Sequence, residues 1–301
     1  MTTAPHFRTR TEMSGIWLPL ITPFHDGELD VTSLTGLLHH YLAAPIDGLI
    51  LAATTGEGLT LDSDETERLV HHAAETTGAR VPLWLGLSGS DTRKLVKAVR
   101  ATRDWPVAGY LIACPYYTRP SQEGLYRHFE AIHAESAKPI AIYNIPYRTG
   151  VNMANDTLLR LAALERVIGV KDCCANHAQT FELLRARPQG FAVMTGEDAL
   201  FFSAVAHGAD GGILAAAHVD PHGFAAVFRD LRDGDRGRAL ARWGALAELA
   251  TLLFAEPNPA PIKHWLWRAG LLRAPDLRLP MTPVSAALAA RIDRQIARPA
   301  V

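Results

Sequence analysis

The sequence predicts an α/β protein built as a closed (β/α)8 TIM barrel with a C-terminal helical extension. Between residues 15 and 217, eight short apolar segments are each followed by an amphipathic stretch. The segments lack strict alternation of apolar and polar residues, which is typical of parallel strands covered on both faces. Parallel neighbours need a crossover, usually a helix, so eight repeats favour a closed barrel over a doubly wound open sheet. No Gly-x-Gly-x-x-Gly motif follows the first segment, which removes the main support for a dinucleotide-binding open sheet.

Each predicted strand is a short, mainly apolar run. In chain order the runs are Ile16–Thr22, Gly48–Thr54, Pro82–Leu87, Val107–Cys114, Pro139–Ile145, Val167–Lys171, Phe191–Thr195 and Gly211–Ala216.

Start signals precede four of the predicted barrel helices. An acidic or hydroxyl side chain at a helix start caps free backbone N–H groups, and glycine or proline favours the helix end. The capped segments are Thr66–Thr77 after Asp62–Glu65, Thr92–Thr102 after Asp91, Gly124–Ser136 after Ser121–Glu123, and Thr157–Leu164 after Asn155 or Asp156.

Beyond about residue 221 the strand-like runs stop and helical segments follow. These segments are Phe224–Leu231, Gly237–Phe254, Pro261–Ala269 and Ser285–Ala297. We therefore expect an N-terminal arm over residues 1–14, the catalytic barrel over residues 15–233, and a C-terminal helical extension over residues 234–301.

The composition of the 301 residues excludes several classes of protein. Hydrophobic residues make up 48% and charged residues 20%, values of globular rather than disordered or fibrous proteins. Lys and Arg total 30 against 31 Asp and Glu, so electrostatics give no reason to expect nucleic acid or a membrane surface as a partner. No apolar run reaches the ~18 residues of a membrane helix, and the polar first residues lack the apolar core of a signal peptide. Three cysteines are too few for a disulfide framework. Together these features predict a soluble, cytoplasmic protein that acts on small molecules.

Lys171 is the sharpest candidate for chemistry, because it ends an apolar run and function in such a barrel lies at the carboxyl ends of the strands. Desolvation there would lower the pKa of the amine and make it available, in its neutral form, for Schiff-base chemistry. The alternative is a lysine that extends to solvent from the strand end. Tyr143, near the end of the preceding run, favours the catalytic interpretation, because imine formation needs a proton shuttle.

Three other strand ends carry candidate binding groups. Residues 53–58, Ala-Thr-Thr-Gly-Glu-Gly, form a turn whose backbone N–H groups suit a carboxylate or phosphate, although taken alone the motif favours an ordinary strand-to-helix turn with its threonines as caps. After the fourth strand, packing is the favoured role of the Tyr116 side chain, while for Tyr117 packing and proton relay are both left as alternatives. After the fifth, Arg148 lies on a loop, where it either clamps an anionic substrate or is simply solvated.

No metal site is predicted. The adjacent pairs Cys173-Cys174, His39-His40 and His71-His72 lack the spacing of metal ligands.

The strand-end motifs resemble those of the dihydrodipicolinate synthase family, which belongs with N-acetylneuraminate lyase to the pyruvate-dependent class I aldolases. The resemblance runs from about residue 15 to residue 284, with the motifs in matching order. The motifs are Thr54-Thr55-Gly56-Glu57, Pro115-Tyr116-Tyr117, Tyr143-Asn144-Ile145-Pro146, Arg148-Thr149-Gly150, Val170-Lys171, Thr195-Gly196-Glu197-Asp198, Glu256-Pro257-Asn258-Pro259 and Arg278-Leu279-Pro280-Met281-Thr282-Pro283.

The resemblance implies a lyase that condenses pyruvate with L-aspartate-4-semialdehyde to 4-hydroxy-tetrahydrodipicolinate, a precursor of diaminopimelate and lysine. Lys171 would form an imine with pyruvate, so that no metal or organic cofactor is needed. Tyr143 would shuttle protons, and Thr54 would link it to Tyr117, which reaches in from a neighbouring subunit. A homotetramer built as a dimer of dimers is implied.

The resemblance also assigns the binding groups. Thr55 and the backbone of its loop would hold the pyruvate carboxylate, and the backbones of Gly196 and Ile213 would line the same pocket. Arg148 would bind the carboxylate of the aldehyde acceptor.

Departures from the family pattern leave an alternative open. Ala53 and Gly58 stand where the family has Gly and Ser, and Asp172-Cys173-Cys174-Ala175 replaces a run that begins with Glu. The changed run supports a paralogous aldolase or dehydratase that acts on a 2-keto-3-deoxy sugar acid or another 2-oxo acid, whereas Arg148 supports the synthase. A non-catalytic binding protein on the same scaffold is a third hypothesis, against which the intact candidate catalytic set argues.

Feedback inhibition by lysine is not expected. Lysine-inhibited members carry polar and acidic residues in a cleft between subunits. The matching positions here hold Gly58, Ser63, Thr66, Ser90 and Lys94, with Tyr116 retained. The ammonium group of residue 94 would repel that of lysine.

Overall fold

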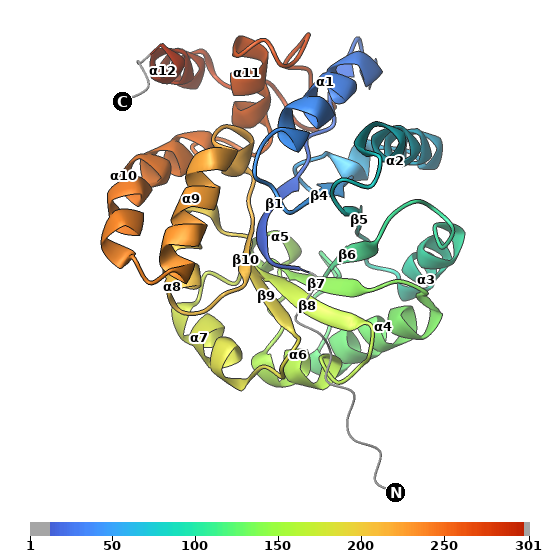
Figure 1. Ribbon diagram of the computed structural model, residues 1–301. Helices are drawn as coiled ribbons and strands as arrows, with labels where there is room; N and C mark the ends of the chain where they lie inside the picture. Colours follow the sequence, from blue (N-terminus) through green and yellow to red (C-terminus); the bar gives the residue numbers. More distant parts are fainter. Residues whose placement is uncertain (1–12, 298–301) are drawn as a thin grey trace, which may run out of the picture.

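The computed structural model describes residues 13–297, so residues 1–12 of the expected N-terminal arm lie outside the described part of the chain. Eight parallel strands close into a barrel that helices surround (Figure 1). Around the barrel the strands are β1 (Gly15–Pro19), β4 (Gly48–Leu51), β5 (Leu83–Leu87), β6 (Gly109–Ala113), β7 (Ile140–Asn144), β8 (Val167–Asp172), β9 (Ala192–Thr195) and β10 (Gly211–Ile213), which pairs again with β1. The predicted (β/α)8 barrel is confirmed, and each strand lies within or within one residue of its predicted run.

Helices follow the strands and form the outer layer of the barrel (Figure 1). They are α1 (Val31–Leu42), α2 (Ser63–Thr77), α3 (Thr92–Ala101), α4 (Gln122–Glu135), α6 (Asn155–Leu161), α7 (His177–Ala186), α8 (Phe201–Ala206) and α9 (Pro221–Arg232). The C-terminal helices are α10 (Arg236–Leu253), which packs against α9, and the neighbouring pair α11 (Ala260–Arg268) and α12 (Ala286–Ile296). Short elements complete the described chain: a hairpin of β2 (Phe24–His25) and β3 (Glu28–Leu29), α5 (Pro146–Thr149), and 3-10 turns at Gly58–Thr60, Asp198–Leu200 and Ala216–His218.

The predicted caps explain where three of the helices begin. The Asp62 carboxylate accepts a hydrogen bond from the backbone N–H of Glu65, whose own carboxylate accepts from the N–H of Asp62. The Asp91 carboxylate accepts from the N–H of Arg93 at the start of α3, and the Ser121 hydroxyl accepts from the N–H of Gly124 at the start of α4. The prediction for α6 was wrong, because α6 begins at Asn155 without a side-chain cap and ends at Leu161. The Asn155 amide instead donates to the backbone oxygen of Gln179.

Large side chains fill the interior of the barrel below its carboxyl end. Trp17 and Trp84 meet edge to face with their ring centroids 5.8 Å apart. Glycine accommodates them on the neighbouring strands, because a Cβ atom at Gly48 or Gly109 would overlap one of the two indole rings. The interior cluster continues upward to Tyr143.

Candidate active site

Lys171 and Tyr143 lie side by side at the mouth of the barrel. They are direct partners in the register of β7 and β8, so both side chains point to the same side of the sheet. Lys171 Nζ lies 4.4 Å from the centroid of the Tyr143 ring. The residues are only 5% and 6% exposed. The lysine therefore does not extend to solvent, which was the alternative explanation for a lysine at a strand end.

Burial dominates the electrostatics of this pair. Desolvation lowers the pKa of Lys171, and the nearby acidic groups of Cys173, Asp198 and Glu197 offset this only in part. Desolvation raises the pKa of Tyr143 well above its usual value, against a smaller opposite effect of its hydrogen bond with Thr54. Both groups are thus biased toward their neutral forms. A neutral amine is a nucleophile, and a neutral phenol can donate a proton to a developing oxyanion.

The loop after β4 carries Thr54 and Thr55 and is held tightly against the barrel. Thr55 is buried, and its Oγ1 accepts a hydrogen bond of 2.9 Å from Asn258 Nδ2. The Gly58 N–H donates to the Ala53 carbonyl over 3.1 Å. Only glycine fits at position 58, because a Cβ atom there would overlap the backbone of Ala52.

The same loop is anchored by a buried ion pair that sequence analysis missed. Lys263 Nζ, on α11, lies 2.5 Å from Glu57 Oε1. The backbone N–H of Arg278 donates to the other carboxylate oxygen of Glu57 over 3.0 Å. Residues of the C-terminal segment, far away in the sequence, therefore hold the threonine loop.

Arg148 lies in the short helix α5 and not, as predicted, on a loop. Proline at the first position of α5 supplies a backbone angle suited to a helix start. A cavity of about 790 Å³ connects this helix to the loops after β4 and β6. Its lining brings together four of the predicted site residues: Thr54, Tyr117, Tyr143 and Arg148.

Tyr117 belongs to this cavity but turns its side chain outward. Its backbone has a φ of 70°, and its N–H donates to the carbonyl of Thr149 over 3.1 Å. The residue is 90% exposed. Its backbone is therefore fixed against α5 while its ring stands free of the rest of the described chain.

Gly196 and Ile213 lie at the ends of β9 and β10, on the other side of Lys171. A Cβ atom at Gly196 would overlap both the Lys171 Cε atom and the Cys173 sulfur. Ile213 is completely buried in the interior cluster that also holds Tyr143 and Cys173. Absence of a side chain at position 196 is thus what leaves room for the lysine.

Two acidic residues follow Gly196, and their environments differ. Asp198 is buried, and its Oδ1 accepts a hydrogen bond of 2.6 Å from the backbone N–H of Ala216. Burial raises the pKa of Asp198 to about 7. The Glu197 carboxyl instead faces Cys173 and Tyr147. Sequence analysis gave neither residue a role, because nothing local distinguishes them from a pair of helix-capping acids.

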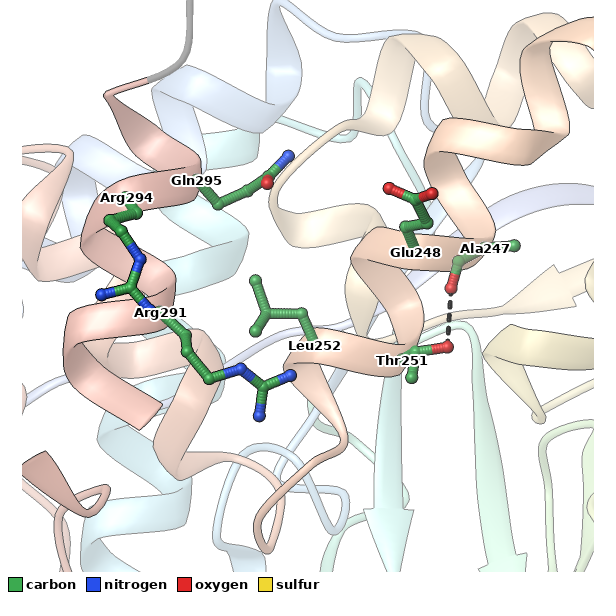
Figure 2. A pocket seen from close by; sticks show the side chains of 7 residues that line it. All are labelled: Ala247, Glu248, Thr251, Leu252, Arg291, Arg294 and Gln295. Atoms are coloured by element: carbon green, nitrogen blue, oxygen red, sulfur yellow. Dashed lines mark hydrogen bonds between the residues drawn. The ribbon is translucent and has the colours of Figure 1, made fainter. Parts of the chain in front are cut away.

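A separate groove of about 530 Å³ lies between α10 and α12 (Figure 2). Arg291 and Arg294 line it from α12, and Glu248 lines it from α10 (Figure 2). It contains none of the predicted site residues.

Within residues 13–297, no group of three or more His, Cys, Asp and Glu side chains could hold a metal ion. The described helices include none that is long and apolar enough to cross a membrane.

Comparison with known proteins places this geometry in context. Residues 12–298 match the model of the dihydrodipicolinate synthetase family. The 4-hydroxy-tetrahydrodipicolinate synthase 2 of Clostridium acetobutylicum is 41% identical over 283 residues, which cover 94% of this chain and 99% of that protein. The 4-hydroxy-tetrahydrodipicolinate synthase of Herminiimonas arsenicoxydans is 36% identical, with 91% and 94% covered. Among solved structures, dihydrodipicolinate synthase from Aquifex aeolicus superposes with a TM-score of 0.91 at 32% identity, covering 94% of this chain and 97% of that one.

Proposed function

The chain belongs to the dihydrodipicolinate synthetase family, whose members are lyases of the class I aldolase type, and we propose that it condenses pyruvate with L-aspartate-4-semialdehyde to 4-hydroxy-tetrahydrodipicolinate. This product is a precursor of diaminopimelate and lysine. The observation that carries the proposal is the buried amine of Lys171 beside the Tyr143 ring at the barrel mouth. No metal or organic cofactor is required, because the covalent imine itself activates the substrate.

The reaction begins when the neutral amine of Lys171 attacks the C2 ketone of pyruvate. Loss of water gives an imine, which acts as an electron sink and makes the methyl hydrogens of pyruvate acidic. Removal of one of them gives an enamine, whose C3 forms a bond to the aldehyde carbon of the acceptor while the aldehyde oxygen takes a proton. The α-amine of the acceptor then attacks C2, closes the ring and releases Lys171. Tyr143 transfers the protons, and Thr54 links it to Tyr117.

The proposal also assigns the binding groups. Thr55 and the backbone N–H groups of its loop hold the pyruvate carboxylate. The backbones of Gly196 and Ile213 line the opposite wall. Arg148, on the lining of the cavity, binds the carboxylate of the acceptor through its planar guanidinium group.

Assembly is part of the proposal. The exposed ring of Tyr117, next to a site that needs a proton relay, supports a dimer in which Tyr117 completes the site of the neighbouring subunit. Two such dimers make the homotetramer that we expect.

Lysine is not an inhibitor in this proposal. Lys94 is exposed on α3 and carries an ammonium group where an inhibitor's own ammonium would need a carboxylate. The inhibition constant for L-lysine checks this, and a micromolar value would contradict it.

The deciding experiment measures turnover of pyruvate and L-aspartate-4-semialdehyde, with the product coupled to its NADPH-dependent reductase. Lys171→Ala is the blank, and Lys97→Ala, at an exposed position of α3, is the matched control. We expect turnover that Lys171→Ala abolishes and Lys97→Ala retains. Borohydride reduction with pyruvate should add the mass of a reduced pyruvyl group at Lys171.

Two other outcomes would contradict the synthase. A protein that traps pyruvate but does not turn over the semialdehyde would be the paralogous aldolase or dehydratase, to be assayed with 2-keto-3-deoxy sugar acids. A protein that traps no pyruvate would be a non-catalytic scaffold.

A further inference from the structure

A half-buried carboxyl group near Lys171 is left without a role by the proposed reaction. Glu197 follows β9, one residue after the glycine whose Cα is packed against Lys171. Its Oε1 is buried and accepts no hydrogen bond from the described residues. Buried polar atoms are normally satisfied, because leaving one unpaired costs about 1–3 kcal/mol. An unpaired carboxyl oxygen near Lys171 and in contact with Tyr147, which lines the cavity, leaves a position for a partner that arrives with the substrate.

The surroundings of Glu197 favour a cationic partner. Burial raises the pKa of Glu197, while hydrogen bonds from the Cys173 thiol and the Tyr147 hydroxyl lower it in part. Both neighbours are neutral donors, because burial raises the pKa of each as well. The neutral form of Lys171, which the reaction needs, leaves Glu197 without a cation. An ammonium group brought by a substrate would supply the missing charge.

Arg148 supplies a positive charge close to Glu197, because both side chains contact Tyr147. The guanidinium carbon of Arg148 lies 5.8 Å from the centroid of the Tyr147 ring, and the hydroxyl of the same ring hydrogen-bonds with Glu197. A carboxyl group and a guanidinium group around one tyrosine match the two charges that an α-amino acid carries on a single carbon.

We propose that Glu197 and Arg148 together recognise the amino-acid end of the acceptor aldehyde, Glu197 binding its α-ammonium group and Arg148 its α-carboxylate. This inference rests on the proposed function and deepens it. For ring closure the bound ammonium group first gives up a proton to the Glu197 carboxylate, and its nitrogen then attacks the carbon that is bonded to Lys171. Asp198 is not available for this task, because it is engaged with the backbone of Ala216.

The test compares two acceptors that differ in the α-amino group: L-aspartate-4-semialdehyde and succinic semialdehyde. Consumption of enzyme-bound pyruvate is measured in a single turnover with each, because succinic semialdehyde has no α-amine to close the ring and release Lys171. The proteins are the wild type, Glu197→Gln, and the control Glu182→Gln, which changes an exposed glutamate on α7. Because a hydrogen bond to a charged group contributes about 1.5–3 kcal/mol, we expect Glu197→Gln to lower kcat/KM for the amino acid roughly 10- to 100-fold. Succinic semialdehyde should be consumed equally by all three proteins.

Several results would overturn the inference. A wild type that uses both aldehydes equally well would already overturn it. A Glu197→Gln protein that keeps the wild-type preference, or that loses both activities to the same extent, would overturn it as well. Borohydride trapping of pyruvate at Lys171 shows that each variant is folded. A wild type that traps pyruvate but consumes no L-aspartate-4-semialdehyde contradicts the proposed function itself, a result distinct from an unchanged preference.

Discussion

Glu57 and Lys263 form an ion pair that is almost completely shielded from solvent, with side chains 2% and 0% exposed. Lys263 Nζ also donates to the carbonyl of Asp276 over 2.7 Å and lies 4.3 Å from the centroid of the Phe24 ring. Desolvation lowers the pKa of Lys263 to about 8, although the charge of Glu57 opposes this effect. The pair joins the C-terminal extension to the loop that carries Thr54 and Thr55.

Removal of one partner should therefore destabilise the protein more than removal of both. Lys263→Met leaves a buried carboxylate without a cation, and we expect its free energy of unfolding to fall by roughly 3–5 kcal/mol. The double variant Glu57→Gln with Lys263→Met should recover much of this loss. Urea denaturation at a fixed protein concentration measures both, with Lys97→Met as the exposed control. Equal losses in the single and double variants would contradict the argument.

Gly196→Ala should abolish most of the activity, because the new methyl group would displace Lys171 and Cys173. The control is Gly244→Ala in α10, where no atom lies within 4 Å of the added carbon. Alanine there should be neutral or stabilising by up to about 1 kcal/mol. Coupled turnover and thermal unfolding of both variants separate the two effects. Full activity in Gly196→Ala would mean that Lys171 tolerates another position.

The pH dependence of imine formation should report the desolvated amine of Lys171. Its pKa is lowered, so the neutral nucleophile becomes populated at a lower pH than for an ordinary lysine. The rate of trapping with pyruvate and borohydride should rise with pH and level off well below the usual lysine pKa of about 10.4. A rate that keeps rising beyond that pH would indicate an unperturbed amine.

Tyr117 should act in the neighbouring subunit. Tyr117→Phe should lower turnover with the fold intact, because the residue is exposed and its backbone contacts are kept. Mixing Tyr117→Phe subunits with Lys171→Ala subunits should restore about a quarter of the wild-type activity, since half of the dimers then contain one intact site. A mixture no more active than Tyr117→Phe alone would show that the tyrosine acts within its own chain.

The sequence predicted best those parts of the site that lie at the ends of neighbouring strands. Lys171 and Tyr143 end consecutive apolar runs, and a parallel barrel necessarily brings the ends of consecutive strands together. It predicted poorly what depends on very short elements. The helix that carries Arg148 is one turn long, too short to show helical periodicity, so its sequence resembles that of a loop.

Contacts between distant segments left no local trace at all. Neither Glu57 nor Lys263 is unusual among its sequence neighbours, and only the packing of α11 on the barrel makes them partners. The same holds for Asn258 and Thr55, and for the orphaned oxygen of Glu197. Such features follow from tertiary structure, which a one-dimensional pattern does not contain.

The hydrogen bond from Asn258 to Thr55 and the Glu57–Lys263 pair have a consequence for synthesis on the ribosome. Every strand of the barrel precedes Asn258, so a nascent chain can close its barrel before the residues that brace the threonine loop have been added. Until α11 emerges, the Glu57 carboxylate has no ammonium partner and Thr55 has no amide donor from Asn258. The contacts that brace the threonine loop are therefore completed only when the last part of the chain has been synthesised.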